Sequence, residues 1–91
     1  MKKKDLKTGM VVKLKNGKVY EVMLDRMDNF NPNILRRSVG WIGLCDYTDN
    51  LLDIDNVRNS NWHIMEIYNP IAPRVNLEDF PEGHELIWKR D

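Results

Sequence analysis

An alternating pattern around one Asn-Gly dipeptide constrains the fold of this chain more than any other feature. Residues 10–14 and 18–24 alternate apolar side chains with other side chains, which is the two-residue period of a half-buried strand. Asn16-Gly17 lies between them and predicts a type I′ turn, which needs positive φ at both central positions. We therefore expect a β-hairpin over residues 10–24. Its core-facing positions are Met10, Val12, Leu14, Tyr20, Val22 and Leu24, with Val11, Lys13 and Lys15 on the opposite, water-facing side.

The remaining segments predict more short strands and no substantial helix. No apolar 3.6-residue period continues for ten residues. Strands are expected at 34–39, 40–46, 62–68 and 86–88, with polar loops at 25–33 and 56–61 and a turn or short helical piece at 47–52. Asn69-Pro70 should end the strand at 62–68, and Pro73 should keep the next stretch irregular. The expected fold is mainly β: a single domain over residues 1–91, built as a small curled antiparallel sheet of the SH3-like barrel type with at most short helical turns.

Charge is unevenly distributed along a chain whose formal net charge is zero. Residues 1–37 contain ten Lys/Arg against four Asp/Glu, and residues 38–91 contain four against ten. This split is typical either of an anionic partner or of charge matching between two halves of one fold.

The cysteine count and the hydropathy pattern predict the compartment. A lone cysteine, Cys45, allows no internal disulfide framework, which favours a reducing interior. Lys2 to Lys4 are not followed by an apolar signal segment, and no run approaches 18 apolar residues. We expect a cytoplasmic protein without a membrane span.

Candidate catalytic groups are few. Cys45 could form a dyad with His63, but it lies beside Asp46 in an apolar run, and we expect it to be a small core residue. Glu82 and His84 offer acid–base groups without a further signature. No serine lies in a nucleophile elbow. The interpretation is a non-enzymatic protein.

Metal and cofactor motifs are absent from the sequence. His63 and His84 are too far apart for a zinc pattern, and the acidic run from Asp46 to Asp55 contains no glycine for a calcium loop. No phosphate-binding glycine loop occurs. We expect neither a metal nor a cofactor.

The lysines of the first hairpin and its approach raise nucleic-acid binding as an alternative function. Proteins that follow a nucleic-acid backbone combine such charge with exposed aromatic side chains. Tyr20, the nearest aromatic residue, should face the core, so a solvated strand face with edge-protecting lysines is the competing interpretation. The nucleic-acid candidates are Lys4, Lys7, Lys13, Lys15 and Lys18.

Aromatic and basic residues elsewhere suggest a partner surface. Trp41 and Trp62 begin expected strands and should anchor the core, whereas Trp88 fits either the core or an interface, including one between two copies of the chain. Phe30 lies in the polar loop, and Arg36 and Arg37 follow it.

Three segments carry a resemblance to a known group of proteins. They are the opening Asp5 to Val12 with Asn16-Gly17, the Asp46-Tyr47 segment with Leu51, and the strand containing Trp62, Ile64, Ile67 and Tyr68. Together they resemble small uncharacterised proteins of phages and prophages of Gram-positive bacteria, over roughly the first seventy residues. Residues 25–37 and the segment after Pro70 depart from that pattern.

The resemblance implies an accessory role for the chain. Small phage proteins of this kind act by binding a host protein or by sequestering a small nucleotide-type ligand, in host takeover or anti-defence. No catalytic or ligand-binding residue carries over from the group. The leading hypothesis is a binding module that engages its partner or ligand through loop 25–37 and nearby basic residues, with Phe30, Arg36, Arg37 and Trp88 as the candidate contacts.

Overall fold

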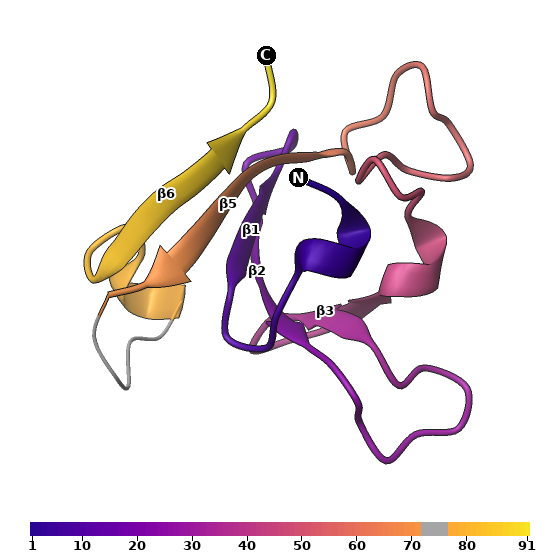
Figure 1. Cartoon of the computed structure of the whole chain (residues 1–91), viewed down its shortest axis with the longest axis horizontal. Helices are drawn as coiled ribbons and strands as arrows, with labels where there is room; N and C mark the ends of the chain where they lie inside the picture. Colours follow the sequence, from indigo (N-terminus) through magenta and orange to yellow (C-terminus); the bar gives the residue numbers. More distant parts are fainter. Residues whose placement is uncertain (72–76) are drawn as a thin grey trace.

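Six antiparallel strands form one curled sheet in the computed structural model, which describes residues 1–71 and 77–91 (Figure 1). The sheet order is β4-β3-β2-β1-β5-β6. Three short 3₁₀ turns accompany it: η1 (Lys3–Asp5), η2 (Leu44–Asp46) and η3 (Leu77–Asp79). The strands are β1 (Val11–Leu14), β2 (Val19–Met23), β3 (Ile34–Arg36), β4 (Trp41–Gly43), β5 (Ile64–Pro70) and β6 (His84–Lys89).

The predicted mainly β class, with a small curled antiparallel sheet and only short helical turns, is confirmed. The sheet is not closed into the expected barrel. In the described part of the chain, β4 and β6 lie at opposite ends of the strand order and do not pair with each other. Within that part, no helix is long and apolar enough to cross a membrane.

The first hairpin forms where the alternation predicts it, but its turn differs. β1 pairs with β2 in a register that places Val12 opposite Tyr20. The Gly17 N–H donates to the Leu14 carbonyl at 2.9 Å, and the Leu14 N–H donates to the Lys18 carbonyl at 2.9 Å. Gly17 has φ +87°, whereas Asn16 does not have positive φ. The predicted type I′ turn is therefore wrong, and the turn is a three-residue loop closed by a left-handed glycine.

The core lies between the concave face of the sheet and the segments that cross it (Figure 1). The alternating residues of β1 and β2 are buried as predicted, with Val12 and Val22 fully inaccessible. Leu6, Leu44, Tyr47 and Leu51 close this core from outside the sheet. The strand expected over 40–46 ends at Gly43, because η2 begins directly after β4. The Leu44 side chain, at the start of η2, is buried in the core.

The opposite face of the sheet is partly covered as well. Val11, expected to face water, is 2% exposed. It lies opposite Glu21 on β2 and Tyr68 on β5, and the Phe80 ring packs edge-on against Tyr68 at 4.8 Å between centroids. Phe80, between η3 and β6, thus packs against the neighbour of Val11 on a side of β1 that alternation alone assigns to solvent.

Two further strand boundaries differ from prediction. β3 ends at Arg36 because the Arg37 N–H donates to the Gly40 carbonyl and turns the chain. β5 continues through Pro70, opposite His84, instead of ending before it. Pro73 lies outside the described residues.

Candidate functional site

The loop between β2 and β3, residues 25–33, is held in shape by its own polar groups. The Asp28 carboxylate accepts hydrogen bonds from the N–H groups of Phe30 at 2.8 Å and Asn31 at 2.9 Å. The Asn33 side-chain oxygen accepts the Asp25 N–H at 2.9 Å. The N–H groups of Asn31 and Phe30 lower the pKa of Asp28, because they stabilise its charged form.

This ordered loop presents two large apolar side chains to solvent. Met27 is fully exposed, and Phe30 is 91% exposed. Leaving a phenylalanine in water forgoes roughly 1.5–3 kcal/mol of burial free energy. A hydrogen-bonded loop that holds such side chains outward has the character of a contact surface.

A groove of about 450 Å³ runs beside the loop. Leu6, Leu24 and Leu44 contribute its apolar lining, and Phe30 and Pro32 lie along it. Its charged lining is balanced: Lys3 and Lys4 oppose Asp25 and Asp49.

One of the two lysines in the groove has a structural role. The Lys3 ammonium group donates to the Tyr47 carbonyl at 2.8 Å and approaches the Leu44 carbonyl at 3.4 Å. It thereby contacts carbonyl groups at the first residue of η2 and at the residue that follows this turn. Lys4, in contrast, is exposed, and its charge is available at the groove.

The predicted partner residues do not gather at one place. Arg36 pairs with Glu21 at 3.4 Å, and the Arg37 guanidinium carbon lies 5.5 Å from the centroid of the Tyr20 ring. Both arginines line a different hollow from the groove beside Phe30. Trp88 packs partly buried against the core, with the Arg90 guanidinium carbon 4.9 Å from its ring centroid.

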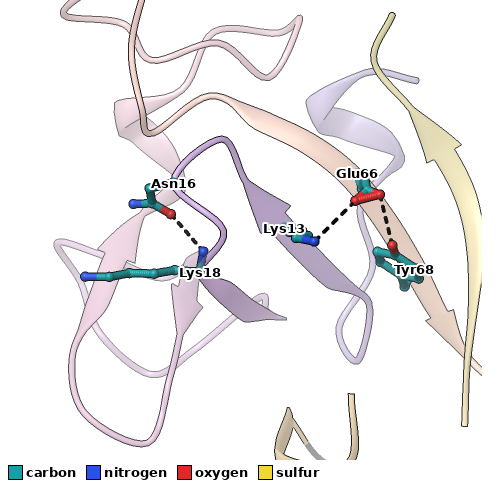
Figure 2. Close-up of polar contacts among 5 residues, drawn as sticks. All are labelled: Lys13, Asn16, Lys18, Glu66 and Tyr68. Atoms are coloured by element: carbon teal, nitrogen blue, oxygen red, sulfur yellow. Dashed lines mark hydrogen bonds and ion pairs between the residues drawn. The ribbon is translucent and has the colours of Figure 1, made fainter. Parts of the chain in front are cut away.

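The nucleic-acid candidates also separate. Lys13 pairs with Glu66 at 3.9 Å, the Lys15 ammonium donates to the Asn59 side chain at 3.1 Å, and Lys18 lies 6.0 Å from the Trp62 ring centroid. Figure 2 shows Lys13 and Tyr68 both directed at Glu66, while Lys18 lies at the turn with Asn16. Lys4 and Lys7 are exposed near η1, away from these contacts.

Besides that for Val11, three sequence predictions about individual side chains are wrong. Trp41 and Trp62 are 53% and 43% exposed instead of anchoring the core. Trp41 lies on the edge strand β4 opposite Arg36, and Trp62 lies two residues before β5 begins. Cys45 is exposed, because η2 turns Leu44 inward and leaves the thiol outside.

The hypothetical catalytic pairs are not assembled. Cys45 lines the groove, whereas His63 is buried and accepts a hydrogen bond from the Asp53 N–H. The His84 ring contacts the Glu82 backbone carbonyl at 3.0 Å, not its carboxylate. Among the described residues, no group of three or more His, Cys, Asp or Glu side chains is placed to hold a metal ion.

Met27 is the site residue that the sequence predictions missed. A methionine in a polar loop offers no pattern that separates an exposed contact from a buried one. No family model, curated protein or solved structure matches this chain.

Proposed function

We propose that this chain is a non-catalytic binding module that engages a host protein through loop 25–33, as an accessory protein of a phage or prophage acting in the host cytoplasm. The observation that carries the proposal is the pair of exposed apolar side chains, Met27 and Phe30, on a loop ordered by Asp28. Aromatic side chains and methionine are enriched at protein interfaces. The phage origin is supported by the resemblance of the opening segments.

The lining of the adjacent groove favours a protein over a nucleotide-type ligand. A nucleotide needs an excess of donors and positive charge for its phosphates. Here Lys3 and Lys4 are offset by Asp25 and Asp49, and Lys3 already donates to backbone carbonyls. A balanced rim around apolar lining suits a side chain from a protein partner.

The test is capture from host lysate with matched surface variants. Met27→Ser with Phe30→Ser removes the proposed contact, and Val39→Ser, at a site that is 87% exposed, is the control. The double variant and the Val39→Ser control should each alter the free energy of unfolding by less than about 0.5 kcal/mol, because the substituted side chains are exposed.

The expected result is a host protein retained by the wild type and by Val39→Ser, with affinity reduced at least about thirtyfold in the double variant, as for an interface hot spot. Equal retention by all three proteins would remove the assignment to loop 25–33. Absence of any retained host protein would overturn the binding function itself.

A further inference from the structure

His63 occupies an unusual position for a titratable side chain. It lies directly before β5 and is 6% exposed. Its Nδ1 accepts a hydrogen bond from the Asp53 N–H at 2.9 Å. Only a ring without a proton on Nδ1 can accept this bond, so the neutral ring carries its proton on Nε2. Nε2 makes no hydrogen bond within the described part of the chain.

The backbone bond to His63 belongs to a network that shapes loop 53–62. The Asp53 carboxylate accepts the Ser60 hydroxyl at 2.6 Å and the Asp55 N–H at 3.0 Å. The Ser60 hydroxyl oxygen in turn accepts the Trp62 N–H at 3.0 Å. The Asp53 carboxylate therefore bonds to residues near both ends of the loop, and the His63 ring bonds to the Asp53 backbone N–H.

We propose that His63 is a pH-sensitive latch on loop 53–62. A proton taken from solvent onto Nδ1 removes the acceptor and sets two N–H donors against each other. The hydrogen bond from Asp53 then breaks, and the loop loses this one link between the Asp53 backbone and the His63 side chain, which lies directly before β5. The change requires no other reactant.

The groups around His63 set the pH at which its ring takes up a proton and the hydrogen bond from Asp53 breaks. Burial is the largest effect and lowers the pKa of His63 below its ordinary value of 6.5, and the Arg90 and Lys15 charges lower it further. The Asp53 carboxylate opposes them, since its negative charge favours the protonated ring. Asp53 itself stays ionised in this range, because the Ser60 hydroxyl lowers its pKa from 3.8.

Release of the loop would alter an exposed part of the surface. Ile54 and Val57 are about half exposed on it, and Trp62 follows at its end. Trp62, Asp53 and Asp55 also line a hollow of about 330 Å³ with Ile42 and Tyr47. This surface is separate from loop 25–33, so the latch does not depend on the proposed function.

Hydrogen exchange of the full chain tests the latch, with rates corrected for intrinsic pH dependence. Between about pH 7.5 and about pH 5, the protection of amides 53–62 should fall about tenfold in the wild type, while β1 and β2 keep theirs. His63→Asn is the matched variant, because its side-chain oxygen can accept the Asp53 N–H but does not titrate. It should show no selective loss in the loop. Equal loop protection at both pH values in the wild type, or equal loosening in His63→Asn, would overturn the latch.

An NMR titration of the wild type keeps the proposal testable if His63→Asn fails to fold. The His63 ring signals should titrate with a midpoint below 6.5, and the Asp53 amide signal should shift with the same midpoint. His84→Asn is the control variant and should leave both midpoints unchanged. If the Asp53 amide signal did not shift with the midpoint of the His63 ring signals, the latch would be excluded.

Discussion

Tyr47 joins the core to the segment that precedes β5. It is 2% exposed, and its hydroxyl donates to the Trp62 carbonyl at 2.7 Å. Burial raises the pKa of Tyr47, with the charge of Asp53 as a second cause, so the hydroxyl keeps its donor proton throughout the neutral range. Tyr47→Phe leaves the Trp62 carbonyl without this partner and should lower the free energy of unfolding by about 1–2 kcal/mol in urea titrations.

Tyr68→Phe is the matched control for that prediction. Its hydroxyl donates to the Glu66 carboxylate at 3.0 Å in a more accessible place (Figure 2). Water can replace this donor, so the expected loss is smaller than that of Tyr47→Phe. Equal losses in the two variants would contradict the importance assigned to burial.

Gly17 is the residue whose backbone conformation closes the first hairpin. Its φ is +87°, and an added Cβ would meet no atom within 4 Å. Gly17→Ala should therefore cost about 1 kcal/mol through backbone strain alone. Gly43→Ala is the comparison, because its Cβ would instead lie 3.2 Å from the side chains of Asn31 and Cys45. Urea denaturation measures both, and an unchanged stability of Gly17→Ala would contradict the left-handed assignment.

At the scale of the elements, alternation predicted the strands better than it predicted their ends. The core positions of β1 and β2 are correct because a two-residue period directly reports which side of a strand is apolar. The turn type is wrong because Asn-Gly fits more than one hairpin loop, and only hydrogen bonding to Leu14 and Lys18 distinguishes them. Val11 shows the remaining limit, since alternation within one strand does not report which side chains the rest of the chain places beside its second face.

The candidate site was predictable only in part. The polar composition of 25–33 indicated a loop, and Phe30 was selected within it. Phe30 lies in the loop before β3, whereas Arg36 is the last residue of β3 and Arg37 follows it, so Phe30 and the two arginines line different hollows. The exposure of Trp41 and Trp62 could not be inferred from residue type, because tryptophan is typical of cores and of interfaces alike.

Arg90, the residue directly after β6, connects this strand to other parts of the fold through hydrogen bonds. Its guanidinium donates to the Ile64 carbonyl at 3.0 Å and to the Asn50 carbonyl at 2.8 Å. Lysine keeps the charge but cannot reproduce this fork of donors. Arg90→Lys should lower the free energy of unfolding by about 1–3 kcal/mol.

Lys89→Arg, a change of the same kind at an exposed neighbour, is the control for Arg90→Lys. It should leave the midpoint of urea denaturation where it is in the wild type. If Arg90→Lys also left the midpoint unchanged, the carbonyl contacts of Arg90 would not contribute to stability.

For the whole molecule, the perturbed groups predict stability that decreases on acidification in two stages. The folded-state pKa of His63 lies below 6.5, so the unfolded chain binds more protons and stability declines as the pH falls from 6.5 to that lower value. The pKa of Asp53 and that of Asp28 lie below 3.8, so a second decline begins as the pH falls through 3.8. Thermal unfolding across this range measures both stages. His63→Asn should remove the first stage and keep the second, and a single acid stage in the wild type would contradict the His63 assignment.

The charge distribution of the whole molecule bears on the nucleic-acid alternative. The Lys13–Glu66 pair joins the basic half of the sequence to the acidic half, and the net charge is zero. Lys15 and Lys18 turn toward Asn59 and Trp62, beside a hollow that also contains Asp53 and Asp55. We therefore expect no retention of single-stranded DNA in filter binding at either about 50 mM or about 200 mM salt. Retention at low salt that falls steeply at high salt, and that disappears when Lys13, Lys15 and Lys18 are changed to alanine, would instead assign the hairpin to nucleic acid, because phosphate contacts impose that salt dependence.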